Sequence, residues 1–166
     1  MFAVVDLMSL EEQVDKDFTV ARRRARLGRL REFFLRRGAR STLLSPDEIP
    51  RSVPASGAMY RGRRTVEVSR IVGSVGKREQ FDQNFMPLPR ASAEKWKRID
   101  RAFRRGQELP AVSLLKLGGD YFVNDGHHRV SVARFHGVEW IDAEVTEYKS
   151  LDTLRCPRTL DRRTAV

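Results

Sequence analysis

The first apolar pattern in the chain is helical and changes face partway along. Its first members follow one another at three- and four-residue spacing: Leu10, Val14, Phe18, Ala21 and Ala25. A second set lies on nearly the opposite face: Leu27, Leu30 and Phe34. Because the stripe changes phase near Gly28, we expect a kink or two helices instead of one amphipathic rod. Ser9 followed by Glu12 fits a capping box at the helix start.

The pattern after residue 60 alternates between strand and helix signals. Val66 and Val68 alternate with polar neighbours, which indicates a strand. Residues 91–105 predict an amphipathic helix whose apolar face is formed by three residues: Trp96, Ile99 and Phe103. Ser92 can cap this helix and Gly106 can end it.

The remaining elements complete a small domain. Two apolar runs flank Gly118-Gly119-Asp120, which predicts a hairpin. A short helix over 130–136 follows, and then a last strand over 138–148 with Val138, Trp140 and Val145 facing inward. This order of elements predicts an α+β fold: a small mixed β-sheet with packed helices.

Three prolines and four serines between residues 39 and 58 indicate a linker. We therefore divide the chain into a basic helical arm (1–40), a linker (41–59), an α+β domain (60–149) and a basic tail (150–166). No apolar run approaches the roughly 18 residues that cross a bilayer, and the start of the chain does not resemble a secretory signal. The single cysteine, Cys156, excludes an intramolecular disulfide. We expect a cytoplasmic protein that does not contact membranes.

The positive charge of the chain is concentrated in the arm. The formal net charge is +10, and residues 21–40 hold one acid, Glu32, against these arginines: Arg22, Arg23, Arg24, Arg26, Arg29, Arg31, Arg36, Arg37 and Arg40. Such a patch suggests a polyanionic partner, and we expect DNA contacts from four of them: Arg22, Arg23, Arg26 and Arg29. The alternatives are a well-solvated helix and a helix that pairs with a second copy in a homodimer.

One turn collects the residues that can carry chemistry. The segment "YFVNDGHHRVSVARFHG" (121–137) holds all three histidines of the chain and runs from a strand into a helix. Amides at a helix start lack partners, and the helix dipole adds about half a positive charge there. Gly126 permits a positive φ angle, while His127, His128 and Arg129 place up to three cationic or donor groups around the same spot. This combination suits a phosphate.

Asp125 does not fit a pure anion site, because its carboxylate would repel phosphate unless it holds a metal ion, orients a histidine or removes a proton. Other interpretations stay open: Asp-Gly is a common turn, Asp125 could cap the helix, and a surface histidine pair needs no function. A zinc site from His127, His128 and His136 fits poorly, since adjacent histidines point to different helix faces. We therefore predict no metal-ligating residues. "GSVGK" (73–77) lacks the Walker spacing and is not a P-loop.

Residues 66–148 resemble the ParB/sulfiredoxin superfamily. "VEVSRIVGSVGKREQFD" is similar to its first motif, with Arg78 and Phe81 at the arginine and aromatic positions. "YFVNDGHHRVSVARFHGVEWIDAEV" is similar to its second, Gly-Glu-Arg-Arg, motif, where Gly126 and Arg129 match the first and last residues. Sulfiredoxins have a catalytic cysteine where this chain has His127, so reduction of sulfinic acids is excluded.

Two other branches of the superfamily differ in the same turn. Partition-type ParB proteins, which bind CTP, have Glu and Arg in place of His127 and His128, and they carry a helix-turn-helix domain after the fold. The turn is most similar to the Asp-Gly-His-Thr-Arg turn of free-serine kinases, with His128 in place of the threonine.

The resemblance implies a pocket for a nucleoside triphosphate or diphosphate, with or without Mg²⁺. Its ligand-binding residues would come from both motifs: Gly126, His127, His128, Arg129, Arg78 and Lys77. Candidate catalytic residues are Asp125, His127 and Glu79, with Asp82 as an alternative to Glu79; "KREQFD" (77–82) is equally consistent with a solvated turn.

Three functions follow. The favoured one is a ParB-like nucleotide- or phosphate-binding protein that acts on or with DNA through the arm, with nuclease or NTPase activity as an option. The second is a nucleotide-dependent small-molecule kinase of the free-serine-kinase type. The third is a non-catalytic interaction module.

Overall fold

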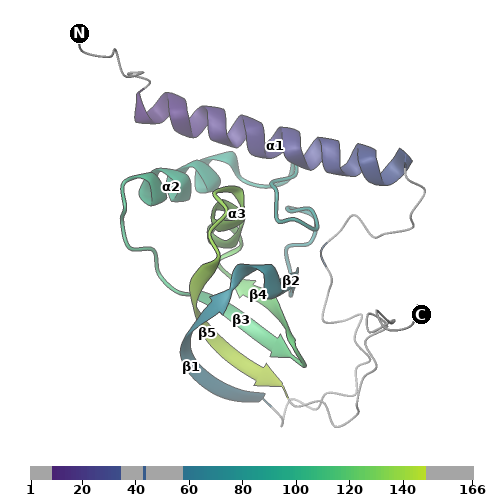
Figure 1. Cartoon of the computed structure of the whole chain (residues 1–166), viewed down its shortest axis with the longest axis vertical. Coiled ribbons are helices and arrows are strands. Elements are labelled where there is room, and N and C mark those ends of the chain that lie inside the picture. Colours follow the sequence, from purple (N-terminus) through teal and green to yellow (C-terminus); the bar gives the residue numbers. More distant parts are fainter. Residues whose placement is uncertain (1–8, 35–42, 44–57, 149–166) are drawn as a thin grey trace, which may run out of the picture.

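A computed structural model describes residues 9–34, 43 and 58–148 of the chain (Figure 1). The elements follow the order α1 (Leu10–Phe34), β1 (Ala58–Glu67), the 3-10 helix η3 (Val68–Arg70), β2 (Ile71–Ser74), α2 (Ala93–Arg104), β3 (Val112–Leu117), β4 (Asp120–Asp125), α3 (His127–Phe135) and β5 (Trp140–Tyr148). The predicted α+β fold with a mixed sheet is confirmed. The basic tail and nearly all of the linker lie outside the described residues.

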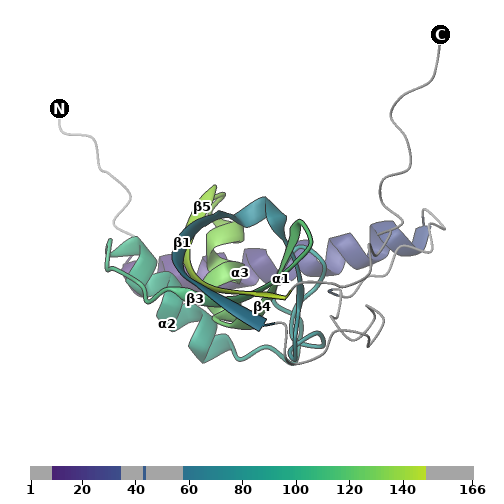
Figure 2. The same cartoon turned by 90° about the horizontal axis from the view of Figure 1, so that it is seen from below.

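The five strands form one sheet in the order β1-β5-β3-β4-β2. The pairs β1–β5 and β3–β4 are antiparallel, whereas β3–β5 and β2–β4 are parallel. The predicted hairpin is confirmed, since β3 and β4 are joined by Gly118 and Gly119. In both views α3 lies against the sheet, and α1 crosses α2 and α3 on the side away from it (Figures 1 and 2).

The main core fills the space between the sheet, α3 and the loop before α2. The sheet, α3 and this loop all contribute buried residues to it, including Val112, Leu114, Val123, Val130, Val145, Phe81 and Phe85. On β5, Ala143 and Val145 are buried while Trp140 is 56% exposed. The prediction that Trp140 faces inward is therefore wrong. Side chains alternate along a strand, so Trp140 lies on the face opposite Ala143 and Val145.

A second core joins α1 to α2 and α3. Phe18, Ala21 and Ala25 pack with Trp96 and Val132, and the rings of Phe18 and Trp96 lie 5.5 Å apart. Three ion pairs connect acids of α1 to bases of α2: Glu11–Arg101, Asp15–Lys97 and Asp17–Arg104. The first half of α1 is thus part of the packed domain.

The structure corrects the expected kink, because α1 is one continuous helix of 25 residues. Only its first apolar stripe meets the domain, whereas Leu27 and Leu30 are 54% and 52% exposed. A change of stripe bends a helix only if both stripes must be buried against one surface, and here they are not. The capping box is confirmed by reciprocal hydrogen bonds between Ser9 and Glu12, at 2.8 and 3.2 Å. Neither α1 nor any other described helix is apolar enough over sufficient length to cross a membrane.

Candidate functional site

The turn between β4 and α3 is tightly packed against the sheet. Gly126 is the N-cap of α3 with φ 95° and ψ 22°, a left-handed conformation that favours glycine. A Cβ at this position would lie 2.7 Å from Cγ1 of Val112 and 3.0 Å from the guanidinium of Arg129. Both the backbone angle and the lack of space therefore require glycine here.

The N-terminus of α3 has no side-chain cap. The first hydrogen bond of the helix runs from the amide of Val130 to the carbonyl of Gly126, at 3.0 Å. The amides of His127, His128 and Arg129 precede this bond, and no partner for them occurs in the described part of the chain. Asp125 does not cap them, because its Oδ2 accepts a hydrogen bond from Nη2 of Arg129, at 2.8 Å.

His127 is buried and its tautomer follows from its neighbours. Its Nε2 lies 2.7 Å from Oγ of Ser74. That hydroxyl oxygen also accepts hydrogen bonds from the amides of Gly76 and Lys77, at 3.2 and 3.0 Å. A hydroxyl has two lone pairs and one proton, so with both lone pairs in use Ser74 donates to Nε2. The proton of the neutral ring is then on Nδ1, which is buried and has no hydrogen-bond partner in the described part of the chain.

His128 lies beside His127 and shares its features. Both rings contact Phe81, His127 stacked at a centroid distance of 6.1 Å and His128 edge-on at 5.2 Å. Nδ1 of His128 is also buried, and no described residue forms a hydrogen bond with it. Burial and the positive charge of Lys77 lower the pKa of both histidines to about 4. Both are therefore neutral at pH 7, which corrects the expectation that they supply charge to the turn.

The positive charge at the turn comes from exposed lysine and arginine side chains. Lys77 follows β2, and Lys95 and Arg98 belong to α2. All three lie close enough to lower the pKa of His128. The sequence pattern indicated Lys77 but not Lys95 and Arg98, because only the packing of α2 beside α3 brings these two to the turn.

Arg129 connects α3 to the segment before β3. Its Nη1 donates to the carbonyls of Pro110 and Ala111, at 2.6 and 2.9 Å, and its Nη2 binds Asp125. The side chain is 14% exposed, whereas that of Asp125 is 69% exposed. Arg129 thus serves the protein's own acceptors, and Asp125 presents most of its carboxylate to solvent.

The predicted residues of the first motif have separate environments. Nε of Arg78 donates to the carbonyl of Leu43, at 2.9 Å. Glu79 is exposed and forms an ion pair with Arg90. Asp82 is buried and accepts hydrogen bonds from the amides of Asn84 and Met86, at 2.9 and 2.8 Å, so it shapes its own loop. Lys77 is the residue of this motif whose charge acts on both histidines.

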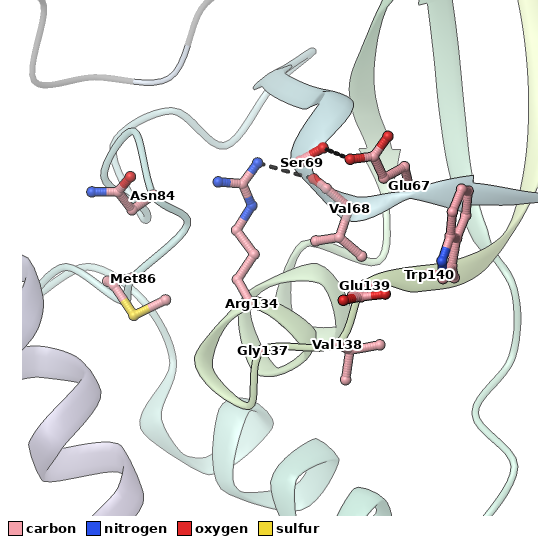
Figure 3. A pocket seen from close by; sticks show the side chains of 10 residues that line it. All are labelled: Glu67, Val68, Ser69, Asn84, Met86, Arg134, Gly137, Val138, Glu139 and Trp140. Atoms are coloured by element: carbon pink, nitrogen blue, oxygen red, sulfur yellow. Dashed lines mark hydrogen bonds between the residues drawn. The ribbon is translucent and has the colours of Figure 1, made fainter.

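A cavity of about 600 Å³ lies at the other end of α3 (Figure 3). It is lined by Glu67, Val68, Ser69, Asn84, Met86, Arg134, Gly137, Val138, Glu139 and Trp140. Nη2 of Arg134 donates to the carbonyls of Val68 and Ile71, at 3.0 and 2.6 Å, so this arginine fastens η3 to α3. Arg134 follows His127 by seven residues, which is roughly 10 Å along the helix axis at about 1.5 Å per residue. The cavity is therefore not part of the predicted site.

The arginines of α1 divide into two groups. Arg24 donates to the carbonyl of Phe135, at 3.2 Å, and lies over its ring. Arg22 is half-buried with its guanidinium 5.7 Å from the ring centre of Phe18. Three more of those whose side chains are described are exposed and have no acidic partner among the described residues: Arg23, Arg26 and Arg29.

Comparison with protein-family models and with curated proteins finds no match. Among solved structures, the crystal structure of sulfiredoxin from Arabidopsis thaliana matches 50% of this chain and 82% of that chain, with 14% sequence identity and a TM-score of 0.39. At this identity and TM-score the similarity assigns neither a family nor an activity.

Proposed function

We propose that the N-terminus of α3 binds the phosphate groups of a nucleotide. The observation that carries this proposal is the coincidence of uncapped amides at residues 127–129 with two buried, unpartnered imidazole nitrogens. A phosphate oxygen accepts hydrogen bonds from such donors, and the helix dipole favours its charge. Lys77, Lys95 and Arg98 supply the positive charge that a diphosphate or triphosphate needs.

The neutral state of the histidines is compatible with this role. The Nδ1 proton of His127 has no hydrogen-bond partner among the described residues, because Ser74 holds the opposite nitrogen. A bound anion would add a negative charge beside His128 and raise its pKa from about 4. Nucleotide binding is therefore expected to be accompanied by proton uptake at mildly acid pH.

The test is calorimetric titration of the full-length protein with ATP, ADP, CTP and GTP, each with and without Mg²⁺. A ligand at 100 times its dissociation constant would also stabilise the fold by about 2.7 kcal/mol. Lys95→Ala is expected to weaken binding about two- to fivefold, as for one partly screened charge. Lys97→Ala is the matched control on the same helix, because Lys97 pairs with Asp15. No binding by any nucleotide, or equal effects of the two variants, would reject the proposal.

Exposure of Asp125 favours a second candidate, phosphoryl transfer from the nucleotide to a small hydroxyl compound. One oxygen of its carboxylate is held by Arg129, and the side chain is 69% exposed, so the other can bind Mg²⁺ or accept a proton. Asp125→Asn would then abolish product formation from ATP and a hydroxy amino acid while nucleotide affinity stays within about threefold. This candidate would be contradicted if the parent protein forms no product and Asp125→Asn only lowers the affinity for the nucleotide.

We also propose that Arg23, Arg26 and Arg29 contact the phosphates of DNA. They are exposed without acidic partners in the described part of the chain, whereas three acids of α1, Glu11, Asp15 and Asp17, are paired with α2. Changing all three to Gln should reduce the slope of log affinity against log salt by up to about 2.7. A control in which Arg64, Arg90 and Arg105 become Gln loses the same charge elsewhere on the surface. An equal reduction in both variants would indicate an effect of net charge alone.

A further inference from the structure

Three helices bring together an imidazole and two carboxylates on the side of α3 away from the sheet. Asp17 belongs to α1, Asp100 to α2, and His136 is the C-cap of α3. One potential ligand atom from each residue lies within 4.8 Å of the others. The side chain of Asp100 is fully buried, and those of Asp17 and His136 are 14% and 17% exposed. The group is therefore an internal junction and not a surface acidic patch.

One oxygen of Asp100 lacks a hydrogen bond inside this junction. Its Oδ1 lies 2.6 Å from Nε2 of His136. Its Oδ2 is inaccessible to solvent and has no hydrogen-bond partner among the residues that the structure describes. The nearest positive charge is Nε of Arg104, at 3.6 Å, which is longer than a hydrogen bond. A buried carboxylate oxygen without a donor is unfavourable unless a proton or a cation compensates it.

Arg104 does not supply that compensation in full, since it is committed to α1. Its Nε donates to Oδ2 of Asp17, at 2.9 Å, and its Nη1 to Oε1 of Gln13, at 3.1 Å. Two carboxylates and one imidazole therefore share one guanidinium. A cation placed between the three ligand atoms would compensate the second carboxylate.

We propose that Asp17, Asp100 and His136 form a binding site for a divalent transition metal ion of the zinc type. One imidazole nitrogen and two carboxylate oxygens form a ligand set typical of Zn²⁺, Mn²⁺, Fe²⁺ and Co²⁺. Bonds of about 2.0–2.2 Å require the three atoms to move slightly closer together. Nε2 of His136 would present its lone pair with the proton moved to Nδ1. Phe103 stacks on that ring with centroids 4.5 Å apart and fixes its plane.

Metal binding at this junction would stabilise the docking of α1. Each helix contributes one ligand, so the ion would cross-link α1 to α2 and to the end of α3. Arg104 could stay on the outer oxygen of Asp17, as a hydrogen-bonding partner of a ligating carboxylate. The sequence contained no signal for this site, because its members come from three distant segments.

Cobalt titration tests the proposal, since visible absorption bands of Co²⁺ report its coordination. The experiment uses full-length protein with the substitution Cys156→Ser, which removes thiolate ligation, and Zn²⁺ as competitor. We expect one Co²⁺ per chain, displaced by Zn²⁺, and a higher melting temperature with Zn²⁺ than with EDTA. Asp17→Asn should weaken binding about tenfold or more, whereas Asp15→Asn, which removes only the exposed pair with Lys97, should bind as the parent does.

Each outcome decides the proposal. Absence of saturable Co²⁺ binding, or an unchanged melting temperature with Zn²⁺, would overturn it. Equal affinities of the parent, Asp17→Asn and Asp15→Asn proteins would also overturn it, because the ion would then bind elsewhere, for example at His127 and His128. If Asp17→Asn disturbs folding, His136→Gln serves as the second ligand variant, with far-UV circular dichroism as the check on structure.

Discussion

Replacing Gly126 with alanine tests whether the turn before α3 requires glycine for two separate reasons. The left-handed backbone is expected to cost about 1–2 kcal/mol for any residue with a Cβ. The new methyl group would also lie 2.7 Å from Cγ1 of Val112 and 3.0 Å from the guanidinium of Arg129. Relief of such overlap within a packed core costs about 1–3 kcal/mol. The sum predicts a loss of about 2–5 kcal/mol in the free energy of unfolding.

Gly137 provides the matched control at the other end of the same helix. It also has a positive φ, 70°, but a Cβ there meets no atom within 4 Å. Gly137→Ala should therefore lose only the backbone contribution, about 1–2 kcal/mol. Urea unfolding followed by far-UV circular dichroism measures both variants. If Gly126→Ala is no less stable than Gly137→Ala, the close approach of β3 to the turn does not restrict this position, and the steric argument is refuted.

Two further predictions concern the histidines and α1. The pKa of His127 is about 4 in the folded protein and about 6.5 in the unfolded chain, so protonation of His127 favours unfolding. The neutral imidazole therefore contributes about 3 kcal/mol to the free energy of unfolding above pH 6.5, and this contribution is lost as the pH falls to 4. Urea unfolding at pH 7.5 and 4.5 should therefore show a smaller difference for His127→Gln than for the parent, and equal differences would contradict the assignment. Phe18→Ala should destabilise the protein by about 3 kcal/mol, because it removes a buried ring packed on Trp96. The control Leu30→Ala, at an exposed position of the same helix, should change the free energy of unfolding by less than about 0.5 kcal/mol. Equal effects of these two substitutions on thermal unfolding would show that α1 is not docked as described.

Features that depend on neighbouring residues in the sequence were predictable. The capping box at Ser9 and Glu12, the hairpin at Gly118 and Gly119, and the apolar face that includes Trp96 all follow from local spacing. The glycine-initiated start of α3 belongs to the same group, since a strand that runs through Gly126 into a helix leaves the first amides of the helix without intrahelical partners.

Features that depend on which surfaces meet were not predictable. Trp140 was placed inward because it is apolar, although the alternation that buries Ala143 and Val145 puts it on the other face. The stripe change near Gly28 indicated a bend, but the domain contacts only one stripe of α1. The histidines were expected to carry charge, yet burial beside Lys77 lowers their pKa.

The sequence alone therefore determined the succession of helices and strands, the concentration of arginines in α1 and the glycine turn that opens α3, because each results from the intrinsic properties of adjacent residues. Only the tertiary structure decided which charges act at that turn and where an imidazole meets two carboxylates. Lys95 and Arg98 lie close to His128, and Asp17 lies close to Asp100 and His136, through the packing of α1, α2 and α3. Electrostatic interactions depend on distance and burial in space, and these are properties of the folded chain.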